Sequence, residues 1–151
     1  MENVLLVSNR FIKEQNILKR EMLILLKDKS VDKAELLIDD SGEQIKMKFI
    51  FKDIEILKEG ELPFYVLVDL RKELEKLGYL LICNGSRIDV YPSRISSVGS
   101  NAYVLELNKK TTLNDLVNIF ETTDKIDLIT TVDKQKLYYM NIMKSAFDNI
   151  P

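Results

Sequence analysis

Residues 45–51 alternate between apolar and polar side chains, and this pattern constrains the fold more than any other feature of the sequence. Ile45, Met47, Phe49 and Phe51 occupy every second position, with lysines at two of the three positions between them. Successive side chains of a β-strand point to opposite faces, so this spacing predicts a strand with one buried face and one wet face. Such strands are typical of antiparallel sheets.

The first third of the chain predicts a β-meander. Apolar runs at 16–26 and 33–38 precede the alternating segment and predict two further strands. The apolar positions change parity after residue 51, which predicts a bulge or turn near Lys52 and Asp53. Residues 1–15 fit either a strand or a loop.

The middle of the chain predicts a helix over 63–77. Leucines from Leu67 to Leu77 recur on one helical stripe, and charged residues mostly fill the other positions. Pro63 suits the first helical turn, and Gly78 is a favoured residue just beyond a helix end.

Two further helices are predicted in the last third. Leu113, Leu116 and Phe120 recur at helical spacing and predict a short helix over 112–120. Thr131 is a good N-cap residue, and the apolar periodicity after it predicts a closing helix over 132–147.

A hairpin is predicted between the first two helices. An apolar strand over 79–83 runs into Asn84 and Gly85, the favoured dipeptide for a two-residue type I′ turn, and residues 86–91 would return as its partner. We therefore predict one α+β domain over residues 1–151. Its antiparallel sheet combines the N-terminal meander, the 79–91 hairpin and a strand over 102–107, packed with about three helices (63–77, 112–120 and 132–147).

Composition excludes several chemistries. The chain has no His and a single Cys, which removes His-activated nucleophiles, His-bearing zinc sites and Cys₄ zinc sites. Cys83 follows an apolar run, which is typical of an inert buried thiol. The acidic pairs lack the spacing of a calcium loop. We expect no catalytic residue, metal site or cofactor.

Charge and hydropathy limit the partners. The formal net charge is −2 and no basic block is visible, so we expect no nucleic-acid binding. No apolar run approaches the roughly 20 residues of a membrane span, and the first residues lack the basic region of a signal peptide. With one Cys and no internal disulfide, a cytoplasmic location is expected. The expected partner is another protein, and a homo-oligomer stays open.

The densest polar chemistry lies in the candidate site between Asn84 and Arg94. One interpretation is structural: a turn, followed by a strand on which Arg87 and Asp89 pair with other charges. The other is an anion site formed by Arg87, Arg94 and the backbone amides around Gly85, because a guanidinium offers a planar fork for anions. The candidate binding residues are Asn84, Ser86, Arg87, Asp89, Tyr91 and Arg94.

Residues 83–93 read CNGSRIDVYPS and follow a helix and a strand. This unit resembles a family of small bacterial proteins of unknown activity that share a helix–strand–"CNGSRxDVYPS" unit. The resemblance covers roughly residues 62–147, with a weaker β-rich N-terminal third. It implies a similar succession of strands and helices and no catalytic residue. The loop over 93–101 differs from the Met/Gly-rich loop of that family, so no loop function carries over.

Two functions from different classes are compatible with the sequence. The first is a non-catalytic protein-interaction module whose acidic surface and 93–101 loop bind another protein. Some relatives in the resembling family look like neighbours of bacterial toxin or secretion systems, which implies an immunity or accessory role. The alternative is a small-ligand or anion-binding protein, or an enzyme, that uses Arg87, Asp89 and Arg94. A third reading, a homodimer subunit, predicts an exposed apolar patch.

Overall fold

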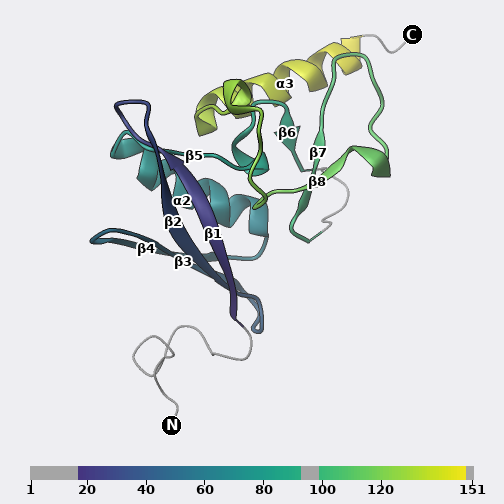
Figure 1. Cartoon of the computed structure of the whole chain (residues 1–151). Helices are drawn as coiled ribbons and strands as arrows, with labels where there is room; N and C mark the ends of the chain where they lie inside the picture. Colours follow the sequence, from purple (N-terminus) through teal and green to yellow (C-terminus); the bar gives the residue numbers. More distant parts are fainter. Residues whose placement is uncertain (1–16, 93–98, 149–151) are drawn as a thin grey trace.

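The computed structural model describes residues 17–92 and 99–148. The predictions for residues 1–15, for Arg94 and for most of the 93–101 loop lie outside these residues. The fold is α+β, as predicted: a five-stranded sheet with its helix lies beside a smaller three-stranded sheet with a second helix (Figure 1).

The predicted meander of three strands is confirmed, and a fourth strand extends it. The four strands are β1 (Ile17–Leu25), β2 (Val31–Asp39), β3 (Ile45–Phe51) and β4 (Ile54–Gly60). Each pairs antiparallel with the next, and the sheet order is β4-β3-β2-β1-β5, where β5 is Leu80–Leu81. The parity change after residue 51 is a tight hairpin turn, in which Lys52 adopts a φ of 55°.

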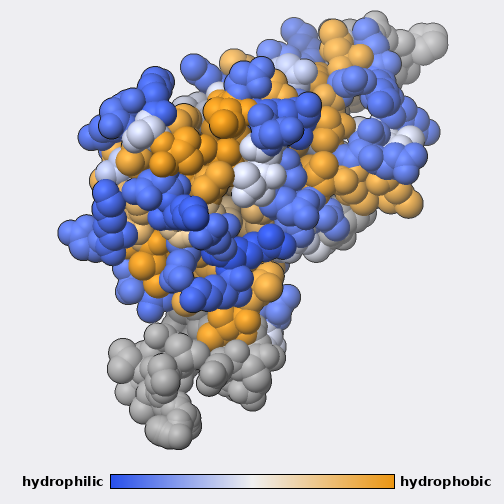
Figure 2. Space-filling model, in the orientation of Figure 1, coloured by the Kyte–Doolittle hydropathy of each residue, from blue (hydrophilic) through white to orange (hydrophobic). Residues whose placement is uncertain are grey.

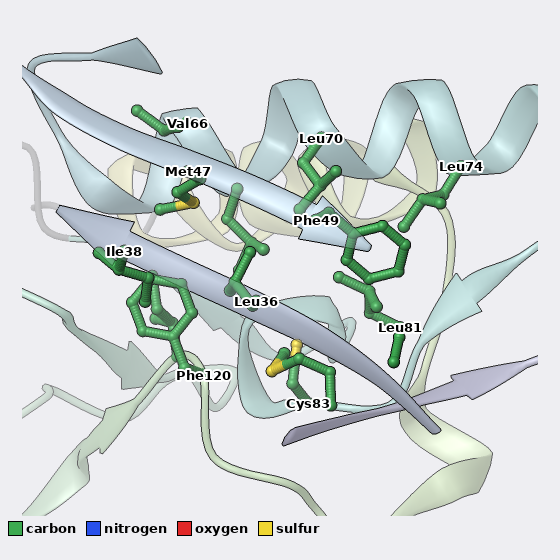
Figure 3. Close-up of a cluster of buried hydrophobic side chains, with 14 of the residues drawn as sticks. Leu36, Ile38, Met47, Phe49, Val66, Leu70, Leu74, Leu81, Cys83 and Phe120 are labelled. Carbon is green, nitrogen blue, oxygen red and sulfur yellow. The ribbon is translucent and has the colours of Figure 1, made fainter. Parts of the chain in front are cut away.

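Helix α2 (Pro63–Lys76) packs on one face of this sheet. Val66, Leu70 and Leu74 point from the helix toward Phe49 and its neighbours on the strands (Figure 3), and all four side chains are buried. Burying one such side chain contributes about 1.5–3 kcal/mol. The helix ends as predicted, because Gly78 takes a φ of 86° that other residues rarely adopt.

The second unit follows this core along the chain. Strands β6 (Val90–Tyr91), β7 (Asn101–Val104) and β8 (Leu116–Asn118) form an antiparallel sheet in the order β6-β7-β8. Helix α3 (Val132–Asp148) packs against β6 and α2. The predicted N-cap is present, because the Thr131 hydroxyl accepts a hydrogen bond from the Lys134 amide at 3.4 Å. Among the described residues, neither helix is long and apolar enough to span a membrane.

The predicted single sheet is wrong, and so is its 79–91 hairpin. Its two halves belong to different sheets: β5 pairs with β1, and β6 pairs with β7. Asn84–Ser86 between them forms a buried 3₁₀ turn. Gly85 does not take the positive φ that a type I′ turn requires. A glycine is needed at position 85 because an added Cβ would lie 2.6 Å from Leu67 Cδ2.

The predicted helix over 112–120 is also wrong, so the described residues contain two α-helices rather than three. Leu113–Asp115 forms a single 3₁₀ turn that Thr112 caps, and β8 follows directly. The helical spacing of the leucines was misleading because Leu113 is 75% exposed while Leu116 pairs with β7. The strand predicted over 102–107 ends at residue 104.

Candidate functional site

The sequence-predicted site lies mostly inside the protein. Asn84, Ser86 and Arg87 are 8%, 1% and 7% exposed, and Asp89 is partly buried. These residues connect the two sheets at the end of β5. Arg94 belongs to the residues that the structure does not describe. The structure therefore brings the 84–89 part of the predicted site together, but in an interior position.

The backbone of this turn is bonded to the segment around β8. The Asn84 amide donates to the Glu121 carbonyl at 2.9 Å, and the Gly85 amide donates to the Ile119 carbonyl at 2.8 Å. The Asn84 side chain donates to the Asn118 carbonyl at 3.0 Å. The amides proposed for anion binding around Gly85 are therefore occupied by protein carbonyls.

Arg87 and Asp89 pair with each other. Arg87 Nε lies 2.9 Å from Asp89 Oδ1, and Nη2 lies 2.8 Å from Oδ2. This is a bidentate ion pair between side chains that are 9% and 17% exposed. The planar fork that would hold an anion is thus already bonded to a carboxylate of the same chain.

Tyr91 belongs to an aromatic cluster. Its ring stacks on Tyr139 of α3, with centroids 4.1 Å apart, and meets Phe64 of α2 edge-on at 5.0 Å. Burial, with smaller contributions from Tyr65 and Tyr139, raises the pKa of Tyr91 to about 12. The phenol is therefore neutral at physiological pH, and its ring joins the two helices.

The most extensive polar network involves two residues that were not among the predicted site residues. Arg71 of α2 is 2% exposed and Gln135 of α3 is 1% exposed. Arg71 Nη1 donates to Gln135 Oε1 at 2.6 Å and to the Gly85 carbonyl at 2.9 Å, and Nη2 donates to the Thr130 carbonyl at 3.0 Å. Burial lowers the pKa of Arg71 from its usual value. The guanidinium acts here as a hydrogen-bond donor to carbonyl oxygens inside the protein.

Gln135 completes this network. Its Nε2 lies 2.9 Å from each of three carbonyl oxygens, those of Gly85, Arg87 and Val90. Glu75 holds the start of α3 in place, because its Oε2 accepts from the Val132 amide at 2.9 Å. The network joins α2, the 84–90 segment and α3, so these side chains have a structural role.

Reactive groups are scarce at this junction. Cys83 is fully buried, and its sulfur lies 3.5 Å from the Ser86 hydroxyl. Burial raises the pKa of the Cys83 thiol, which keeps it protonated and unreactive. Over residues 17–92 and 99–148, no three Cys, Asp or Glu side chains gather in a way that would hold a metal ion.

A surface groove lies elsewhere, along the C-terminal half of α3. A groove of about 370 Å³ separates α3 from the 105–111 segment that follows β7. We call it the α3 groove. Its apolar lining comes from Leu105, Ile142, Met143 and Ala146, and its polar lining from Glu106, Asn108, Lys109, Lys110 and Thr111.

Large apolar side chains on the two elements that flank the α3 groove are open to solvent. Leu107 is 57% exposed and Leu113 75% on the segment after β7, while Met140 is 52% and Phe147 76% exposed on α3. Figure 2 shows hydrophobic side chains gathered where the end of α3 meets the connection between β7 and β8. Single exposed apolar residues are ordinary, whereas a large contiguous apolar patch is typical of an interaction site. We call the α3 groove together with these four residues the C-terminal face.

No family model matches the chain, and no curated protein is significantly similar to it.

Proposed function

We propose that this protein is a non-catalytic module that binds another protein through its C-terminal face. The observation that carries the proposal is the exposure of Leu107, Leu113, Met140 and Phe147 around the α3 groove. Removing apolar area from water on binding is worth roughly 25 cal/mol per Å², and buried apolar anchors dominate many protein interfaces. A partner that covers these side chains would remove their apolar area from water, and this would favour binding.

The interior position of the CNGSR motif supports a non-catalytic role. Arg87 is neutralised by Asp89 at 2.8 Å, and the amides of Asn84 and Gly85 are bonded to carbonyls. The alternative, a small-ligand or anion-binding protein or an enzyme based on Arg87, Asp89 and Arg94, would require this ion pair to open. Replacing Arg87 by Lys and titrating inorganic phosphate would test it: a phosphate affinity that falls sharply in the variant would favour the alternative.

The sequence resemblance leads to a narrower form of the proposal. In that form the partner is a bacterial toxin or a secretion component, and the chain acts as an immunity or accessory protein. Co-expressing the chain with a neighbouring toxin gene tests this form. Cells that make the toxin should survive only when the chain is present with an intact C-terminal face.

The general proposal is tested by affinity capture from the source organism with tagged full-length protein. Replacing Met140 and Phe147 together by Glu should abolish capture of the partner without loss of fold, because both side chains are more than half exposed. The matched control replaces Leu57, which is 49% exposed on the edge strand β4. Capture that survives the double substitution but is lost with Leu57→Glu would place the binding surface on the sheet and contradict the proposal.

A further inference from the structure

Asn84 and Gly85 form the one Asn-Gly pair of the sequence. Such a pair is chemically labile, because a glycine without a Cβ lets its backbone nitrogen approach the side-chain carbon of the asparagine. In the reaction the Gly85 nitrogen gives up its proton and bonds to Cγ of Asn84, and the side-chain nitrogen leaves as ammonia. Water then opens the resulting succinimide ring to aspartate or isoaspartate. The pair is therefore a candidate site of spontaneous deamidation.

The folded chain engages both reacting groups. The Gly85 amide, which must lose its proton, donates to the Ile119 carbonyl at 2.8 Å. The Asn84 side-chain amide, which must leave, donates to the Asn118 carbonyl at 3.0 Å. Ring closure moves Cγ of Asn84 onto the Gly85 nitrogen, so it requires both hydrogen bonds to break.

Packing also opposes the reaction. A base must take the Gly85 amide proton and water must open the ring, but Asn84 is 8% exposed and Gly85 is buried. A Cβ added at Gly85 would lie 2.6 Å from Leu67 Cδ2 and 3.1 Å from Ile119 Cβ. Close-packed surroundings of this kind leave the turn little room to rearrange while the junction is closed.

The product of the reaction does not fit the closed turn. An aspartate at position 84 has no donor for the Asn118 carbonyl, which now accepts from the side-chain amide. An isoaspartate adds a methylene to the backbone of a turn that is packed against Leu67. Either product would leave the 84–86 turn poorly matched to the segment around β8.

We propose that Asn84 is a deamidation site that the closed junction protects, and that its reaction prevents the 84–86 turn from closing again on the segment around β8. The reaction proceeds only from a transiently opened junction, because native proteins open locally at a cost in free energy. The deamidated fraction therefore records how long the junction has been open. This inference concerns the interior junction and is independent of the C-terminal face.

The first experiment measures deamidation of the full-length chain by peptide mass spectrometry, in buffer and in urea. Ser41→Asn supplies the control, because it creates an Asn-Gly pair in an exposed loop where Gly42 meets no atom within 4 Å. Opening gives up three hydrogen bonds of Asn84 and Gly85, so the native rate at Asn84 should be at least about a hundredfold below the rate in urea. The pair at 41–42 should react at similar rates in both. Equal rates at Asn84 in buffer and urea, or no reaction in urea, would overturn the inference.

The second experiment weakens the junction in the Ser41→Asn background. Gln135→Glu removes the Nε2 donor that lies 2.9 Å from the Gly85 carbonyl. It should raise the native rate at Asn84 at least about tenfold and leave the rate at 41–42 unchanged. A rate at Asn84 that does not change, or that rises equally at both sites, would refute control of the reaction by this junction.

The third experiment tests the product. Asn84→Asp should raise the ratio of unfolded to folded chain about ten- to hundredfold in urea unfolding, because a buried hydrogen bond is replaced by an unpaired carboxylate. Asn141→Asp, at an exposed position of α3, is the matched control and should change this ratio little. If Asn84→Asp does not fold, deamidated wild-type chain separated by ion exchange gives the same comparison. A product as stable as the wild type would overturn the claim that the turn cannot close again.

Discussion

Replacing Gln135 by Glu tests whether the interior junction needs a neutral donor at this position. The substitution keeps the shape of the side chain and the oxygen that accepts from Arg71 at 2.6 Å. It replaces Nε2, which lies 2.9 Å from the carbonyl oxygens of Gly85, Arg87 and Val90, by an oxygen. A carboxylate cannot donate to any of the three carbonyls.

The size of the effect follows from the bonds that are lost. Each intramolecular hydrogen bond contributes about 0.5–1.5 kcal/mol net, and an unsatisfied buried group costs about 1–3 kcal/mol. The Gly85 carbonyl keeps Arg71 Nη1 as a donor, and the Arg87 carbonyl keeps the Val90 amide at 3.2 Å. The new carboxylate would form an ion pair with Arg71, but this pair offsets little, because the added charge must itself be desolvated. We therefore expect a loss of about 2–4 kcal/mol at neutral pH.

Urea unfolding followed by circular dichroism measures this loss by linear extrapolation. The melting temperature should fall by about 4–16 °C, since 1 kcal/mol corresponds to roughly 2–4 °C in a chain of this size. Gln44→Glu in the exposed turn before β3 is the control, with an expected change within about 0.5 kcal/mol. If Gln135→Glu is as stable as the wild type, or more stable, then the ion pair outweighs the carbonyl contacts and the reasoning is wrong.

Three further predictions concern the same junction. Gly85→Ala should destabilise the fold by about 1–3 kcal/mol in the same unfolding assay, because its Cβ would lie 2.6 Å from Leu67 Cδ2. Gly42→Ala meets no atom within 4 Å and should be nearly neutral, and equal effects of the two would contradict the packing argument. Cys83 should react with a thiol reagent far more slowly in the native protein than in urea, because burial raises its pKa; equal rates would refute this. The pKa of Tyr91 is raised from 10 to about 12, so its contribution to stability is present below pH 10 and is lost as pH rises toward 12. Between these two pH values, the free energy of unfolding should fall less in Tyr91→Phe than in the wild type. Identical pH dependences of the two proteins would contradict the raised pKa.

The parts of the fold that depend on local periodicity could be predicted from the sequence. The alternation over 45–51 gave a strand with one buried face, because its period of two is a property of neighbouring residues. The leucine stripe and Gly78 gave helix α2 and its end for the same reason. The predicted helix over 112–120 failed because apolar residues at short spacing fit a 3₁₀ turn followed by a strand equally well.

The candidate site depended on contacts that are distant in sequence. Arg71 and Gln135 are 64 positions apart, and Arg71 meets the Thr130 carbonyl across 59 positions. No local pattern marks a side chain whose partners are backbone carbonyls of another segment. The pairing of Arg87 with Asp89 could have been predicted, because the two residues are two positions apart. One interpretation of the sequence already paired both residues with other charges.

The polar character of the CNGSR motif follows from the shortness of the strands that it joins. Strands β5 and β6 have two residues each, so their ladders end early and leave inward-facing carbonyls at the junction. Buried carbonyls require donors, and Arg71 and Gln135 supply them. Changes in this network should therefore lower stability first and affect binding only through unfolding. Changes at Met140 and Phe147 should lower binding and leave stability unchanged, because both side chains already lie in water. A set of variants in which affinity and stability vary independently would assign recognition to the C-terminal face and architecture to the motif.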